Sequence, residues 1–222
     1  MRPCFCGARA ALRWISRWYA RGVRLLGRTV VECTRDRLGN LIGQDVATIA
    51  RVAVDAAPVV VDPFAGSANT LVWIRRHLPG SRAIGFESDR AVFTATMRNL
   101  AVLGIELDFH EVDYEGGLRG LVLPDGSPLI VFIAPPWGDA LTKTSGLDLR
   151  RTSPPVSAIV DLIVGAFPRR PLVLAAQVYE RFDRSSLSDL AAAFDSTTVK
   201  LYDIDEPGRN HGLALLTAGW SQ

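Results

Sequence analysis

The sequence is poor in cysteine and contains no apolar run near the ~20 residues that a membrane span needs. Its three cysteines, Cys4, Cys6 and Cys33, are too few and too clustered for a disulfide framework, and the lone Cys-x-Cys pair argues against a zinc site. The N-terminus has scattered arginines but no clean apolar segment with a cleavage site, so no secretory signal is predicted. We therefore expect a reduced, cytoplasmic protein without a membrane partner.

Common phosphate-binding patterns are also missing. Neither a Gly-x-Gly-x-x-Gly fingerprint nor a Walker loop occurs, since residues 66–70 read Gly-Ser-Ala-Asn-Thr. These absences argue against a dinucleotide and a nucleoside triphosphate. The histidines His77, His110 and His211 are scattered without metal-ligand spacing, so we interpret them as structural and expect no metal.

Lysine is scarce, because only two of the 25 basic residues are lysines, and arginine is concentrated at one end. Residues 1–37 carry nine arginines against Glu32 and Asp36, which leaves this segment at +7 and the remainder at −5. A helix is predicted over residues 8–28, with arginines every four residues from Arg9 to Arg21. This stripe could contact RNA phosphates, form a solvated helix face, or pair with acidic surface elsewhere in the protein. We predict a basic helical extension over residues 1–37.

The rest of the chain alternates strands and helices, which is typical of a parallel α/β sheet. A helix over 40–56 precedes strands over 59–62, 83–86, 107–112, 129–133 and 171–175, and helices over 69–77, 89–103, 156–166 and 187–194 alternate with them. The final strands, 198–202 and 213–217, read as an antiparallel hairpin. With 48% hydrophobic residues, residues 38–222 fit a single domain with one core.

Two of the predicted strands end at proline corners. The apolar run 129–133 is followed by Ala134-Pro135-Pro136-Trp137-Gly138, and the run 59–61 by Asp62-Pro63-Phe64-Ala65-Gly66. Ligands of open α/β sheets bind at the carboxyl ends of strands. Trp137 would be held there as a rigid stacking surface. The alternative is that it packs in the core beneath a loop, and its place beside two prolines favours stacking.

Acidic residues follow three successive strands. Glu87 lies 25 residues after Asp62, where a carboxylate can accept hydrogen bonds from both ribose hydroxyls, and Asp113 is placed to accept from an adenine amine. One such acid would most simply cap a helix, but three together favour a nucleoside pocket. Tyr179, after the fifth strand, is a candidate substrate contact or a surface-loop residue.

Residues 62–70 resemble motif I of the class I S-adenosylmethionine-dependent methyltransferases, especially those that methylate nucleic-acid amines. Residues 134–138 resemble their motif IV. Together with Leu147-Asp148-Leu149, this corner is most similar to the trimethylguanosine synthase family of RNA cap guanine-N2 methyltransferases. The resemblance covers about residues 40–220. It implies a Rossmann-like, seven-stranded, mostly parallel sheet with a C-terminal antiparallel hairpin, preceded by N-terminal helices.

The resemblance also implies S-adenosylmethionine as cofactor and assigns roles. Asp62 and Gly66 would border its methionine part, Glu87 its ribose and Asp113 its adenine. The full cofactor set is Asp62, Phe64, Ala65, Gly66, Asn69, Thr70, Glu87, Asp113 and Ala134, the catalytic pair is Pro135 and Trp137, and the substrate contacts are Pro136, Trp137 and Tyr179. The acceptor would be a planar base of RNA or a planar small molecule.

Two residues depart from the family pattern. Ala134 replaces the usual Ser, Asn or Asp, so a backbone carbonyl of Ala134 or Pro135 would have to accept from an attacking amine. Ala68 replaces the second glycine of motif I and is expected to tighten the cofactor pocket. Oxygen and carbon nucleophiles therefore stay open. So do a small-molecule methyltransferase, a cofactor-binding module that acts on RNA or a partner without methyl transfer, and a non-methylating reaction aided by the sulfonium.

Overall fold

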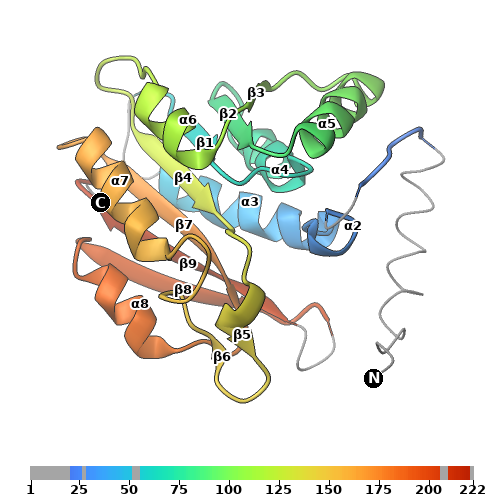
Figure 1. The fold of residues 1–222 in the computed structure, drawn as a ribbon. Coiled ribbons are helices and arrows are strands. Elements are labelled where there is room, and N and C mark those ends of the chain that lie inside the picture. Colours follow the sequence, from blue (N-terminus) through green and yellow to red (C-terminus); the bar gives the residue numbers. More distant parts are fainter. Residues whose placement is uncertain (1–20, 27–28, 52–55, 206–209, 221–222) are drawn as a thin grey trace.

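A seven-stranded sheet runs through the computed structural model, which describes residues 21–26, 29–51, 56–205 and 210–220 (Figure 1). The strand order is β3-β2-β1-β4-β7-β9-β8. The parallel strands are β1 (Val59–Asp62), β2 (Arg82–Glu87), β3 (Asp108–Glu111), β4 (Leu129–Ile133) and β7 (Leu172–Tyr179). The strand β9 (His211–Ala218) is antiparallel to both β7 and β8 (Ser196–Tyr202). The predicted seven-stranded, mostly parallel sheet with a C-terminal antiparallel hairpin is confirmed.

The central strands are apolar because both of their faces are covered. In β1, Val59 and Val61 join one core cluster and Val60 joins the other. Val60 pairs in register with Ala83 of β2 and Ile130 of β4, and all of β1 is buried. This burial explains the unbroken apolar runs of the sequence.

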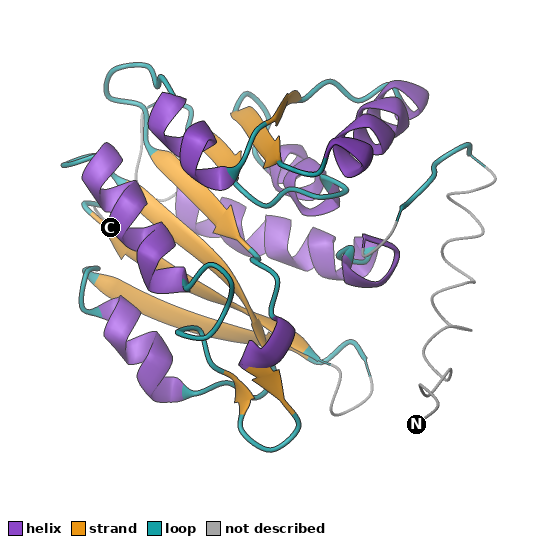
Figure 2. Cartoon of the chain, viewed as in Figure 1, coloured by secondary structure: helices purple, strands orange, loops and turns teal. Residues whose placement is uncertain are grey.

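Helices cover the two faces (Figure 2). One layer holds α3 (Asp36–Arg51), α4 (Asn69–His77) and α5 (Arg90–Leu103), and the other holds α6 (Tyr114–Gly120), α7 (Val156–Ala166) and α8 (Arg184–Ala191). Within the described residues, no helix combines the length and apolarity needed to span a bilayer.

Several element bounds differ from the predictions. The first long helix begins at Asp36, four residues before the predicted start, and is described as far as Arg51. The helix α6 was not predicted, because its Gly116-Gly117 pair lowers helix propensity. Asp113 starts that helix by accepting a hydrogen bond from the Gly116 N–H at 2.7 Å.

The helix predicted over residues 8–28 is wrong where the structure describes it. Residues 21–26 are a turn and an extended segment, followed by the short helix α2 (Thr29–Glu32). Gly22 has φ of +87°, which ends any helix there, and Asn99 bonds the backbone of Arg24 instead. Arg9, Arg13 and Arg17 lie outside the described residues.

Candidate active site

A cavity of about 480 Å³ opens at the carboxyl edge of the parallel strands. Its volume falls in the roughly 300–1,000 Å³ range of small-molecule sites. All but one of the predicted site residues line it: Asp62, Phe64, Ala65, Gly66, Asn69, Thr70, Glu87, Asp113, Ala134, Pro135, Pro136 and Trp137. The exception, Tyr179, packs against Trp137 from behind. The lining falls into two halves, which we name after the roles that the sequence predicts for their residues: a cofactor half, from the turns after β1, β2 and β3, and an acceptor half, from the ends of β4, β7 and β9.

Two buried carboxyl groups define the cofactor half. Asp62 and Glu87 are only 2% and 4% exposed. Burial raises the pKa of Asp62 to about 7, the negative charge of Glu87 adds to the rise, and the hydrogen bond from the Phe64 N–H opposes it. Glu87 accepts a hydrogen bond from the Asp89 N–H at 2.7 Å, which fixes its carboxylate beside the cavity.

The turn between β1 and α4 brings backbone close to these carboxyls. Gly66 has φ of +50°, and a Cβ built there would lie 4.0 Å from Glu87 Oε2. The Gly66 carbonyl accepts a hydrogen bond from the Thr96 hydroxyl at 2.8 Å, which ties the turn to α5. Any side chain at this position would strain the backbone and enter the cavity.

Ala68 also has a positive φ, +56°, but it lies behind the turn. It is fully buried and belongs to the apolar cluster that includes Val72, Leu100 and Phe109. Ala68 is absent from the cavity lining, so the expectation that it tightens the pocket is not met.

Asp113 and Tyr114 close the far end of the cofactor half. Asp113 both caps α6 and lines the cavity, so its capping role does not remove it from the cavity wall. The ring of Tyr114 stacks on Phe64 with centroids 5.3 Å apart. This pair gives the end of the cavity an aromatic wall beside a carboxylate.

An aromatic cluster forms the acceptor half. The indole of Trp137 stacks on the His211 imidazole, with centroids 5.4 Å apart and planes at 27°. Tyr179, the last residue of β7, meets both rings edge-on, at 6.3 Å from Trp137 and 6.2 Å from His211. Trp137 is therefore a wall residue with one face already covered, and only its other face can stack on a ligand.

His211 lines this cavity and also packs against Trp137 and Tyr179. Gln177 Nε2 lies 3.0 Å from His211 Nδ1, and with the amide in this orientation Nδ1 accepts and the ring proton sits on Nε2. Burial lowers the pKa of His211, and the charge of Arg35 lowers it further, against Asp205 and Glu180. The imidazole is thus a neutral N–H donor at neutral pH.

Residues 29–36, which we call the strap, contribute Thr29, Glu32, Cys33, Thr34 and Arg35 to the lining of the cavity. Asn69 Nδ2 donates to the Thr34 carbonyl at 2.6 Å, on the cofactor side. Arg35 pairs with Asp205 at 2.6 Å, next to the loop that leads into β9. The strap thus contacts both halves. Sequence reasoning missed it, because the contacts join positions 35 to 170 residues apart.

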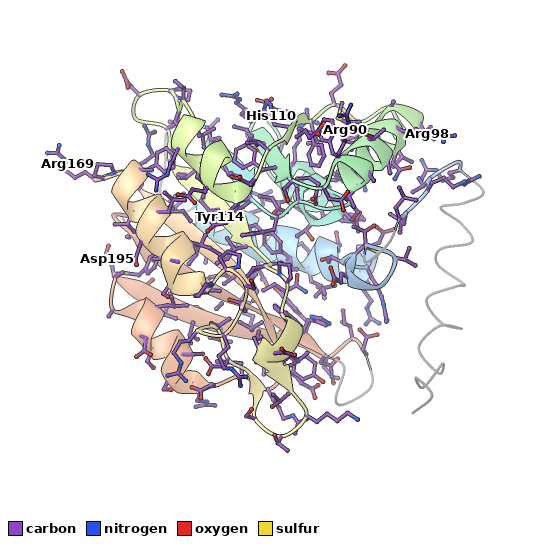
Figure 3. All side chains as sticks on the ribbon, in the orientation of Figure 1. Arg90, Arg98, His110, Tyr114, Arg169 and Asp195 are labelled. Carbon is purple, nitrogen blue, oxygen red and sulfur yellow. The ribbon has the colours of Figure 1, made fainter. Side chains whose placement is uncertain are left out.

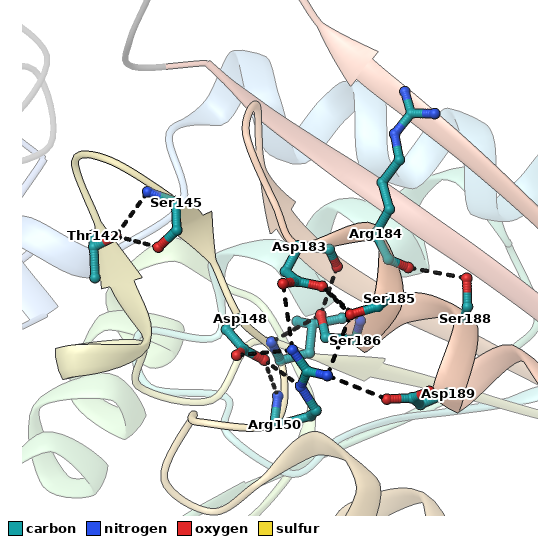
Figure 4. A network of polar contacts seen from close by, with 11 residues as sticks. Thr142, Ser145, Asp148, Arg150, Asp183, Arg184, Ser185, Ser186, Ser188 and Asp189 are labelled. Carbon is teal, nitrogen blue, oxygen red and sulfur yellow. Dashed lines mark hydrogen bonds and ion pairs between the residues drawn. The ribbon is translucent and has the colours of Figure 1, made fainter.

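The chain after Trp137 is braced from outside the cavity (Figure 4). Leu147 and Leu149 are buried, and the Leu149 N–H donates to Ser186 Oγ at 3.2 Å. Arg150 pairs with Asp148 at 2.9 Å, and it reaches Asp183 and Asp189 at 3.3 and 3.5 Å. This network anchors the loop after the proline corner to α8.

The sequence matches no protein-family model and has no significant match among the curated proteins. Solved structures share its fold. The methyltransferase domain of METTL16 superposes with a TM-score of 0.63 at 14% identity, over 95% of both chains. A Klebsiella pneumoniae protein described as a candidate O-methyltransferase gives 0.58 at 11% identity, over 96% of this chain and 89% of that one. A candidate methyltransferase from Streptococcus mutans, in complex with SAH, gives 0.51 at 15% identity, over 83% and 98%.

The fold is therefore that of the class I methyltransferases. At these identities, the likeness defines the architecture and leaves the acceptor open.

Proposed function

We propose that the protein is an S-adenosylmethionine-dependent methyltransferase whose acceptor is a planar, nitrogen-containing group, with an RNA or guanine-like base as the favoured substrate. The observation that carries the proposal is the single cavity in which Asp62, Glu87 and Asp113 meet the corner at Pro135 to Trp137. The motif resemblance to trimethylguanosine synthases supports the base, and the fold supports the reaction class.

The residues of the cofactor half fit S-adenosylmethionine. Glu87 is buried and held by the Asp89 N–H, so it can accept from ribose hydroxyls without reorganisation. The positive-φ turn at Gly66 leaves space beside Asp62 for an ammonium or sulfonium group. Such a positive charge would favour the ionised form of the Asp62 carboxyl. Phe64 and Tyr114 offer faces for adenine next to Asp113. When bound, the cofactor supplies an electrophilic methyl group.

The acceptor half would position the nucleophile and exclude water. Trp137 presents one indole face to a planar acceptor, because His211 covers the other. Carbonyls of Ala134 and Pro135 would accept from an amine that gains positive charge as it attacks. His211 packs on the indole face opposite the acceptor and would hold Trp137 in place for stacking.

A planar small molecule is the second candidate acceptor. Ala134 removes the side chain with which related enzymes hold an amine, and this favours an oxygen or carbon nucleophile on a smaller substrate. The two candidates differ in what they need beyond the cavity, because a polymer requires a path along the surface.

Calorimetry with S-adenosylmethionine and S-adenosylhomocysteine tests the class of protein. Binding of both is expected, and no heat at high cofactor concentration would contradict the proposal. Transfer of a labelled methyl group to total RNA, compared with a set of planar small molecules, then identifies the acceptor. Binding without transfer to either would support a cofactor-binding module instead.

A further inference from the structure

A second hollow lies outside the active-site cavity, where residues 21–26 run along α5. Three arginines line it: Arg24 from the extended segment, and Arg90 and Arg98 from the helix. Small residues, Ala91, Thr94 and Ala95, lie between the two helix arginines, and Leu25 and Leu26 complete a lining that is mainly apolar between the charged groups. We call this hollow the arginine groove. Figure 3 shows Arg90 and Arg98 on the side of the molecule where the chain enters α2.

The wall of the groove is fixed to the fold. The buried side chain of Asn99 donates to the Arg24 carbonyl at 2.7 Å and accepts from the Arg24 N–H at 2.8 Å. Gly22 turns the chain at φ +87°, where a Cβ would lie 3.3 Å from Val102, and Val23 is buried. Arg24 is therefore held at the groove by its backbone.

The charge of the groove is of one sign. Residues 21–26 and α5 together contain four arginines and no acidic residue. In the part of the chain that the structure describes, Arg90 and Arg98 form no ion pair. The nearest acid in sequence, Asp89, accepts hydrogen bonds from the Ala91 and Val92 N–H groups at the start of α5. This side of the molecule therefore attracts anions, although residues 38–222 are net acidic.

The spacing of the arginines favours a ligand with several phosphates in a row over a single anion. Arg90 and Arg98 are eight residues apart on α5, a rise of about 12 Å along its axis. One guanidinium group can bind two oxygens of the same phosphate. The small residues between the two arginines leave room for the sugars that join successive phosphates. The groove also starts beside the active site, because Arg90 is three residues after Glu87 and Ser88 lines the cavity.

We infer that the arginine groove binds the sugar–phosphate backbone of a nucleic-acid strand whose neighbouring base is presented to the cavity. This inference deepens the proposed function, because the presentation of a base to the cavity rests on that function. Backbone binding itself can be measured without any methyl transfer.

The test is fluorescence anisotropy of a labelled single-stranded RNA with the full chain, over a range of salt concentrations. The double variant Arg90→Ala/Arg98→Ala should bind the RNA at least about tenfold more weakly. The negative slope of log affinity against log salt should become shallower by about 0.7 for each lost contact. Arg169→Ala is the matched control, because Arg169 is an exposed arginine on the opposite side in Figure 3. It should leave both quantities unchanged.

Calorimetry with S-adenosylmethionine separates the two proposals, since the double variant should keep the affinity of the parent. Equal RNA affinity and equal salt slopes in parent and double variant would overturn the groove assignment, even if the cofactor binds. Arginine-dependent binding to anionic vesicles, without binding to RNA, would overturn it in favour of a membrane surface.

Discussion

The two halves of the cavity are built in different ways. In the cofactor half, Asp62, Glu87 and Asp113 each accept a hydrogen bond from a backbone N–H two or three residues further along the chain. In the acceptor half, Trp137, Tyr179 and His211 come from three strand ends that lie up to 74 residues apart. The first half is specified by local sequence, and the second depends on how β7 pairs with β9.

This contrast separates two kinds of requirement. A cofactor that is the same in every reaction needs fixed carboxylates and a backbone that approaches it closely, and short sequence motifs can encode both. A particular acceptor needs a shaped aromatic surface, and long-range pairing lets that surface change without altering the turns. We therefore expect substitutions in the cofactor half to change cofactor affinity, and those in the acceptor half to change turnover.

Replacing Glu87 should have the largest effect. Glu87→Ala removes the carboxylate that is expected to accept two charge-assisted hydrogen bonds, so the Kd for S-adenosylmethionine should rise about 100-fold or more. Titration calorimetry measures it. Glu115→Ala is the control, because Glu115 is an exposed residue of α6 that pairs with Arg119. Unchanged affinity in the Glu87 variant would refute the ribose role.

Trp137→Ala should affect the other half. Loss of a stacking face worth about 1–3 kcal/mol predicts methyl transfer at least roughly fivefold slower, with the cofactor Kd unchanged. Trp137→Phe keeps an aromatic face and should recover part of the rate. If the alanine variant lost cofactor affinity instead, the division into halves would fail.

Asp62→Asn should change the pH dependence of stability. The folded pKa of about 7 exceeds the ordinary value of 3.8, so the folded state holds the proton more tightly and stability falls as pH rises from about 4 to 7. Asn cannot ionise and keeps an oxygen for the Phe64 N–H. We expect the variant to be more stable than the parent at pH 8, by an amount that shrinks as the pH falls toward 4.

Urea unfolding at these two pH values measures the difference. A stability difference that does not depend on pH would show that Asp62 is not buried in its charged form.

Ala68→Gly should have the smallest effect. Relief of the positive φ, about 1 kcal/mol, is offset by loss of a buried methyl group, worth about 0.8 kcal/mol. Because Ala68 lies behind the turn, cofactor affinity should not change. A changed cofactor Kd in calorimetry would show that Ala68 does shape the cavity.

Much of the fold followed from the sequence. Apolar runs that are buried on both faces, and the acids and prolines that end them, marked β1, β2 and β4. The same signals marked twelve of the thirteen predicted site residues, which line the cavity from the strand ends and the turns that follow them. The strap and His211 were missed because long-range contacts place them, such as Asn69 to Thr34 and Tyr179 opposite His211. Of the helix predicted over 8–28, the described residues 21–26 are not helical because Asn99 binds the Arg24 backbone, which arginine periodicity cannot reveal.

A crystal structure of the complex with S-adenosylhomocysteine would test the central claim most directly. The account predicts that the ribose hydroxyls lie within hydrogen-bond distance of Glu87, with adenine near Asp113 and the sulfur directed at the corner from Ala134 to Trp137. A ligand bound outside this cavity, or one with its ribose away from Glu87, would contradict it.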